Sequence, residues 1–315
     1  MYVYVYVIVY QSVSLFQFFV NHTKLKCLFI YDVNVYNQPK MNENHLTLTR
    51  YLYAKKIVKI SLLISLLDRK KEEALFWAYE LYHSGFGRGV FIFIHKIFDL
   101  FYKKENKPLE KFIIQSTEEW NKDKSQHHLL GSLIVTLAAR KHDLVAAPAA
   151  EPKKRKFIFK MKPEDVAVYN TAEPGHKNLP AWKILPTVCL YPLRQNLNEA
   201  FGIAPPDLGI YNSERWIYYA ARSPVWEDRL LEFGAVLGED ETVVFPDEHQ
   251  EELFYNLWGY EPDEQSAELK AKFVGAAEEP QNTFRETGGM LSEFVGEVCS
   301  RSHENPAPKG VNRNS

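Results

Sequence analysis

The chain is organised around residues 54–103, AKKIVKISLLISLLDRKKEEALFWAYELYHSGFGRGVFIFIHKIFDLFYK. In the middle of the stretch, apolar residues recur at i, i+3, i+4, i+7 and i+8, the spacing of one face of an α-helix. These residues are Ala74, Trp77, Ala78, Leu81 and Tyr82. Glu72, Glu73 and Glu80 lie off that face. Gly85 follows, and a glycine just beyond a periodic run is typical of a helix end.

The runs on either side, Ile57 to Leu67 and Val90 to Phe101, are apolar on nearly every side, which predicts buried helices. Helices joined by such short turns pack antiparallel. Further helices are predicted over 109–120, after the break at Lys107-Pro108, and around 130–138. Residues 41–142 are therefore predicted to form an all-α bundle of about five helices.

The pattern changes beyond residue 156. Short β-branched or aromatic runs predict strands at 157–159, 166–169, 184–191 and 242–245. Helices are predicted at 214–221, 224–233 and 247–258, and from Glu261, with Pro262 at its first position, to about residue 277. The predicted fold class is α+β and mostly helical: a helical domain at 41–142, an Ala/Pro linker with a basic run at 143–156, a smaller acidic α+β domain at 157–299 and a disordered tail at 300–315.

Composition places the chain among ordinary globular proteins. Of its 315 residues, 46% are hydrophobic and 25% are charged. Cys27, Cys189 and Cys299 lie far apart, without metal-ligand or disulfide spacing, which favours a reducing compartment. The net charge of −2 is uneven, because 227–304 holds 20 acidic and 5 basic residues. A nucleic-acid surface is therefore expected only in the N-terminal half.

The first forty residues are unusual. Residues 1–23 carry no charged side chain and are long enough for a membrane anchor. Their alternation of Tyr and Val resembles a translated TATGTA-type repeat, and Met41 opens a normal soluble start. The favoured interpretation is an over-extended start at 1–40. The alternatives are a membrane anchor at 1–23, and an edge strand or disordered arm.

Two basic groups are candidate recognition sites. Pro152, Lys153, Lys154, Arg155 and Lys156 match a monopartite nuclear localisation signal in a linker, with a solvated linker or a nucleic-acid contact as alternatives. A weaker nucleic-acid candidate is the basic rim of the first helix pair. Its members are Lys55, Lys56, Lys59, Arg69, Lys70 and Lys71. Acidic neighbours make a solvated face the preferred interpretation of this rim.

No motif predicts a catalytic, cofactor-binding or metal-binding site. GFGRG lacks the Gly-Lys-Ser/Thr ending of a phosphate loop. The carboxylates of EPDEQS (261–266) suit the first turn of a helix better than acid–base chemistry. Several other side chains are assigned structural roles, in a helix start, the core or a strand. They are His95, His127, His128, Cys189, Trp216, Tyr218, Tyr219 and Trp226.

Four segments resemble an uncharacterised protein family of giant DNA viruses, the nucleocytoplasmic large DNA viruses. They are LTLTRYLY (46–53), DRKKEEALFWAYELYHSGF (68–86), SPVWEDRLLEFG (223–234) and FYNLWGYEPDEQSAEL (254–269). The resemblance covers about 41–275. It implies a helical N-terminal part before an α+β part, and it brings no activity, catalytic residue or cofactor.

These observations lead to an expectation of a non-enzymatic protein-interaction module. It would act in the host nucleus or a cytoplasmic viral factory, and it could be packaged in the virion. Its protein partners are not specified by the sequence. One alternative is a nucleic-acid-binding accessory factor that uses the basic N-terminal half. The other is a virion or membrane component anchored by residues 1–23.

Overall fold

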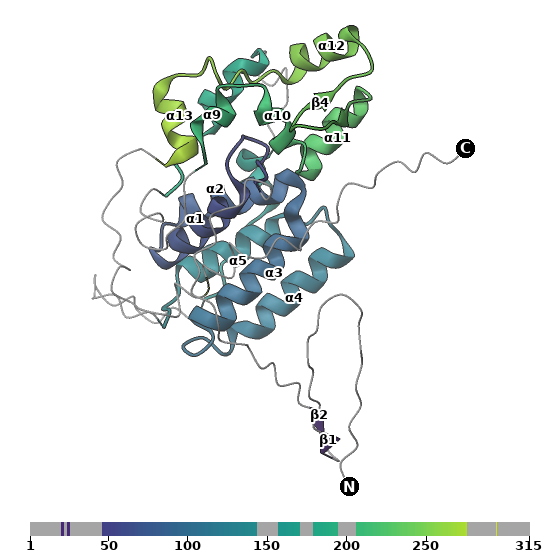
Figure 1. Cartoon of the computed structure of the whole chain (residues 1–315). Helices are drawn as coiled ribbons and strands as arrows, with labels where there is room; N and C mark the ends of the chain where they lie inside the picture. Colours follow the sequence, from purple (N-terminus) through teal and green to yellow (C-terminus); the bar gives the residue numbers. More distant parts are fainter. Residues whose placement is uncertain are drawn as a thin grey trace. The chain divides into compact units, whose positions relative to one another are not determined.

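The structure is a computed structural model of the chain that describes residues 20–21, 24–25, 46–143, 157–170, 179–194, 206–275 and 294. The chain divides into two compact units, 1–38 and 39–315 (Figure 1). In the first unit, β1 (Val20–Asn21) pairs antiparallel with β2 (Lys24–Leu25). Most of 1–40, on which the start and anchor hypotheses depend, lies outside the described residues.

Five α-helices follow one another in the first half of the second unit. They are α1 (Lys55–Leu67), α2 (Lys71–Leu81), α3 (Gly87–Ile97), α4 (Leu109–Lys122) and α5 (His128–Ala138). Short π-helical turns, η2 (Tyr82–Phe86) and η3 (Phe98–Tyr102), follow α2 and α3. The periodicity of the sequence thus predicted these helices correctly.

Helix α2 is the centre of this half, because α1 and α5 both pack against it. It is buried from Glu73 to Leu81, so it presents no solvent face over most of its length. Helices α3 and α4 lie beside each other (Figure 1), where Phe91 stacks on Trp120 with ring centroids 4.4 Å apart. Burying each large aromatic side chain of this kind contributes roughly 1.5–3 kcal/mol.

The second half consists of shorter elements. The helices are α6 (Pro163–Val166), η4 (Ala167–Tyr169), η6 (Ala181–Lys183), α7 (Ile184–Val188), α9 (Leu208–Tyr211), α10 (Arg215–Ala220), α11 (Pro224–Glu232), α12 (Glu248–Trp258) and α13 (Ala267–Val274). The strands β3 (Val236–Leu237) and β4 (Val243–Val244) form an antiparallel hairpin. The fold is mostly helical α+β, which confirms the predicted class.

Three of the predicted strands are wrong. Residues 166–169 and 184–188 are helical, and 157–162 is extended without strand pairing. In the last segment, the N–H groups of Phe159 and Met161 donate to the hydroxyls of Thr136 and Ser132 on α5, and not to a neighbouring strand. Short apolar runs do not distinguish a strand from a buried helix by periodicity, which is why the prediction failed.

The helix predicted to open at Glu261 also begins elsewhere. Residues 262–264 form a turn, and α13 starts after Ser266, whose hydroxyl accepts from the Leu269 N–H at 3.3 Å. Serine is a better N-cap than glutamate, because its short side chain reaches the free N–H groups of the first turn. The carboxylates of Glu261, Asp263 and Glu264 therefore precede the helix.

One buried core includes residues from both predicted domains. Val166 and Leu185 are as fully buried as Leu133 of α5, and all three belong to the same hydrophobic cluster. Residues 39–315 form a single compact unit. Most of the predicted linker at 143–156 lies outside the described residues, and the division into separately folding domains stays a prediction.

Gly85 is a point where the two halves meet. It has φ +91°, inside the π-helical turn between α2 and α3. A β-carbon at this position would lie 2.5 Å from Cβ of Pro224, the first residue of α11. Only glycine combines this backbone conformation with such a close approach.

Replacing Gly85 with alanine should therefore lower the free energy of unfolding by about 2–4 kcal/mol, from backbone strain plus overpacking. Gly234→Ala is the matched control, because Gly234 has a similar φ of +69° but its added β-carbon would come no nearer than 3.0 Å to Pro246, at Cγ. We expect the control to cost about 1 kcal/mol in urea unfolding. Equal losses in the two variants would contradict the close contact at Pro224.

Candidate functional site

Residues 46–54 form a buried turn, here called the junction loop. Eight of its nine residues are buried. An antiparallel bridge joins Leu48 to Ala54, and the Thr49 N–H donates to the carbonyl of Tyr53 at 2.8 Å. Leu52 has φ +66°, which is uncommon for a residue other than glycine. The surrounding packing must hold this loop in place, because its backbone is strained.

Groups far along the chain supply that support. The Trp226 indole N–H donates to the carbonyl of Thr49 at 3.1 Å, and the Tyr211 hydroxyl donates to the carbonyl of Leu52 at 2.9 Å. In the other direction, the Tyr53 hydroxyl donates to the carbonyl of Tyr191 at 2.7 Å. The junction loop therefore connects the helices of the first half to the short elements of the second.

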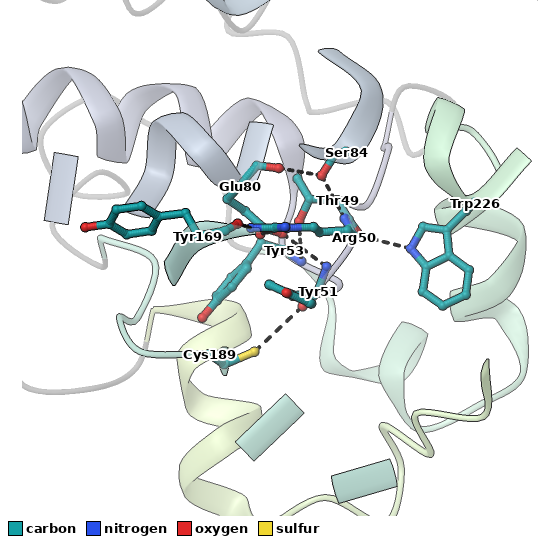
Figure 2. A network of polar contacts seen from close by, with 9 residues as sticks. All are labelled: Thr49, Arg50, Tyr51, Tyr53, Glu80, Ser84, Tyr169, Cys189 and Trp226. Atoms are coloured by element: carbon teal, nitrogen blue, oxygen red, sulfur yellow. Dashed lines mark hydrogen bonds and ion pairs between the residues drawn. The ribbon is translucent and has the colours of Figure 1, made fainter. Parts of the chain in front are cut away.

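Arg50 is the only charged residue of the junction loop, and it is 2% exposed. Its Nε donates to Oε2 of Glu80 at 2.9 Å, and its Nη2 donates to the carbonyl of Tyr169 at 3.0 Å. Figure 2 shows these groups gathered with Ser84, whose Oγ accepts from the backbone N–H of Arg50 at 2.8 Å. Glu80 also accepts from the Tyr51 N–H through Oε1 at 3.1 Å.

Glu80 is 0% exposed, although the helical wheel places it off the apolar face. The wheel assumes that one side of α2 faces water, whereas α2 is enclosed by its neighbours. A carboxylate inside a core requires a cation and hydrogen-bond donors. The junction loop supplies both through Arg50 and the Tyr51 N–H.

A second buried arginine repeats this arrangement. Arg194, 5% exposed, makes a bidentate contact with Glu73: Nε to Oε1 at 2.8 Å and Nη2 to Oε2 at 2.6 Å. Its Nη1 lies 3.4 Å from Oδ2 of Asp68. Burial raises the pKa of Asp68, and the charge of Arg194 acts against that rise. Arg194 thus attaches the segment after α7 to the first turn of α2.

A third buried arginine, Arg229, lies against the rings of Trp226 and Trp258. None of the three arginines was selected from the sequence. The signal for Arg229 was available, since Trp226, Arg229 and Leu230 follow the i, i+3, i+4 spacing of a buried face. The carboxylates that pair with Arg50 and Arg194 could not be predicted from the sequence, because ion pairs between distant residues leave no local pattern.

His83 borders the same network. It stacks on Tyr79, and its Nε2 is buried without a hydrogen-bond partner in the part of the chain that the structure describes. Burial lowers the pKa of His83 to about 3, with further lowering by Arg50 and His127. His83 is therefore neutral at physiological pH, and it adds no charge next to Arg50.

The basic rim does not form one cluster. Lys55, Lys56 and Lys59 lie on the first turns of α1, whereas Arg69, Lys70 and Lys71 follow its C-terminal end. A 13-residue helix separates the two groups by about 20 Å. The Lys55 ammonium lies 3.9 Å from the ring centre of Phe86. The candidate localisation signal, Pro152 to Lys156, lies outside the described residues.

The histidine and aromatic candidates lie in helices, at a helix start or in the core, and His95 is half-buried. His95 Nε2 lies 2.8 Å from the Thr117 hydroxyl, and His127 precedes the first residue of α5. Trp216, Tyr219 and Trp226 are buried in the core, with Tyr218 partly buried against it.

Cys189 is buried as predicted, but it ends a helix and not a strand. Burial raises the pKa of its thiol. Burial also raises the pKa of Glu261, with smaller effects from Glu264 and Asp263. Across the described ranges, no group of three His, Cys, Asp or Glu side chains is placed to hold a metal ion.

A group of exposed apolar side chains lies on α11, the β3–β4 hairpin and α12. Aromatic residues of these segments pack around the buried Phe254. Six large apolar side chains of these elements are exposed, and one of them is Leu237 of β3, at 36%. We call the other five the hairpin surface: Leu231, Val236, Val244, Leu253 and Leu257. Val236 and Val244 are cross-strand partners, so they share one face of the hairpin.

No family model matches this chain, and no curated protein or solved structure was found to match it. Within the described ranges, no helix has the length and apolar character needed to cross a membrane.

Proposed function

We propose that this chain is a non-enzymatic protein-interaction module whose partner binds the hairpin surface. The observation that carries the proposal is the exposure of Val236 and Val244, at 55% and 51%, together with that of Leu231, Leu253 and Leu257 on the neighbouring helices α11 and α12. Exposed groups of large apolar side chains are typical of protein interaction sites. A hairpin pair of this kind offers a flat apolar contact.

The acidic residues around the hairpin surface indicate the charge of the partner. Between residues 227 and 258 there are ten acidic residues and one basic residue, the buried Arg229. The exposed carboxylates belong to Asp228, Glu232, Glu239, Asp240, Asp247, Glu248, Glu251 and Glu252. We therefore propose a partner segment with apolar side chains flanked by lysine or arginine, because complementary charges speed association and favour the correct partner.

The cellular setting is part of the same proposal. The resemblance to giant-virus proteins and the run Pro152 to Lys156 support action in the host nucleus or a viral factory. The competing proposal is a nucleic-acid-binding accessory factor. It has less support, because the six basic residues of the rim lie at opposite ends of α1.

Affinity purification of the full chain from virus-infected cells, with and without nuclease, tests the proposal. We expect partner proteins to survive nuclease and to be lost from the double variant Val236→Ser/Leu253→Ser. Ile92→Ser is the matched control, since Ile92 is an equally apolar, 40% exposed side chain on α3. Synthetic peptides from the recovered partner should bind less tightly at high salt.

Two results would contradict the proposal. If the partners disappear with nuclease, nucleic acid is the bridge, and the basic N-terminal half becomes the region to study. If the double variant and Ile92→Ser retain the same partners, the hairpin surface is not the site of contact. Circular dichroism of each variant confirms that the fold is intact before the partners are compared.

A further inference from the structure

The extended segment 157–162 is attached to the rest of the fold along one edge. Backbone groups of alternate residues in the segment bind side chains on α5 and just after it, over distances of 2.8–3.3 Å. The residues of the segment are Phe157, Phe159 and Met161, and their partners are Arg140, Thr136 and Ser132. Contacts at every second residue are typical of one edge of a β-strand.

The opposite edge of segment 157–162 is open. Ile158 and Lys160 alternate with the bonded residues, so their backbone groups are directed away from α5. Among the residues that the structure describes, none forms a hydrogen bond with the backbone N–H or carbonyl of Ile158 or Lys160. The side chain of Ile158 is 44% exposed, and that of Phe157 is 75% exposed. An open edge with exposed apolar side chains is a template for pairing with another strand.

The charge of this segment is opposite to that of the hairpin surface. Segment 157–162 contains two exposed lysines, Lys160 and Lys162, and no acidic residue. The next carboxylates along the chain, Glu164 and Asp165, belong to the first turn of α6. The elements of the hairpin surface carry exposed carboxylates and no exposed basic side chain between residues 227 and 258. The segment therefore has the chemistry proposed above for the partner, which is apolar side chains flanked by lysine.

We propose that segment 157–162 of one copy of this chain pairs, as an added strand, with the β3–β4 hairpin of a second copy. This inference rests on the proposed function, because it identifies the partner of the hairpin surface as the chain itself. The hairpin is a sheet of two strands in the described structure, so each strand has an outer edge. An added strand gains main-chain hydrogen bonds for Ile158 and Lys160, and its alternate side chains provide specificity.

The pairing joins two copies, because the two surfaces belong to different parts of one copy. Segment 157–162 is held by α5, which packs against α1, α2, α4 and α6. The hairpin instead lies with α11 and α12, where Phe233 and Phe245 contact Phe254. Since the two contacting surfaces are not the same, the association is head-to-tail, and copies can follow one another in a ring or a filament.

Analytical ultracentrifugation of the full chain over a range of protein concentrations tests this inference. We expect the wild type to form oligomers larger than a dimer, and to dissociate as the salt concentration rises. The hairpin variant Val236→Ser/Leu253→Ser and the segment variant Ile158→Ser/Lys160→Glu should each raise the dissociation constant at least about tenfold. Ile92→Ser is again the matched control and should associate as the wild type does.

Mixing the two double variants is the sharper test, because each variant retains the surface that the other has lost. We expect each variant alone to be monomeric and an equimolar mixture to form a 1:1 dimer and nothing larger. Circular dichroism confirms that both variants are folded before they are mixed.

The inference is overturned if the wild type is monomeric, if either variant associates as tightly as the wild type, or if the mixture gives no dimer. These results leave the proposed function standing when the proteins recovered from infected cells still depend on the hairpin surface. If the recovered proteins are also unaffected by Val236→Ser/Leu253→Ser, both the self-pairing and the proposed function fail.

Discussion

Replacing Glu80 with glutamine is expected to lower the free energy of unfolding by about 3–5 kcal/mol, the typical cost of leaving one member of a buried ion pair unpaired. Glutamine preserves the shape of the side chain but removes its charge. Arg50 would then remain in the core with its Nε facing a neutral amide. Urea unfolding followed by tryptophan fluorescence measures the loss, since Trp77 and Trp226 are both fully buried.

The control for Glu80→Gln is Asp99→Asn. Asp99 pairs with Lys103 at 3.0 Å on the surface, where both side chains are largely exposed. Surface pairs contribute little, so this variant should be almost as stable as the wild type. The double variant Arg50→Met/Glu80→Met should recover most of the stability, because it removes both charges from the core. If Glu80→Gln is as mild as Asp99→Asn, the buried pair is not what holds the junction loop.

Replacing Arg194 with alanine is also expected to lower the free energy of unfolding by about 3–5 kcal/mol at pH 7.5. The change leaves Glu73 buried without its bidentate partner, and it removes the charge beside Asp68. It also releases the segment after α7 from the first turn of α2. Thermal unfolding followed by circular dichroism at several pH values measures the effect.

The loss of stability in Arg194→Ala should depend on pH through the protonation of Asp68. Burial already raises the pKa of Asp68, and removal of Arg194 would raise it further. The folded variant would then bind more protons than the unfolded chain above pH 4, so its stability rises as pH falls toward 5. The difference between variant and wild type should therefore be smaller at pH 5 than at pH 7.5.

Arg215→Ala is the matched control for Arg194→Ala. Arg215 pairs with Glu241, but its side chain is 42% exposed. Because solvent screens this pair, its removal should lower the free energy of unfolding by less than about 1 kcal/mol. A difference between Arg194→Ala and wild type that grows as the pH falls would contradict the role assigned to Asp68.

The sequence predicted some elements well because their signals are local. Helices α1 to α5 were found from the spacing of their apolar residues, and α11 and α12 from a proline or acidic start followed by one apolar face. Helix α7 was missed, because Ile184, Leu185 and Val188 are β-branched or apolar residues that suit a strand equally well over so short a run. The helix is formed because these side chains face the shared core.

The amino-acid sequence alone therefore predicted a mostly helical chain with an acidic C-terminal half. Periodicity and composition carry both properties, and each depends only on neighbouring residues. Two buried ion pairs depend on the folding of the whole chain: Glu80 pairs with Arg50, 30 residues away, and Glu73 pairs with Arg194, 121 residues away. The sequence does not show whether a charged side chain faces water or a partner of opposite charge. Its role is set by long-range packing, because packing alone determines whether water can solvate the charge.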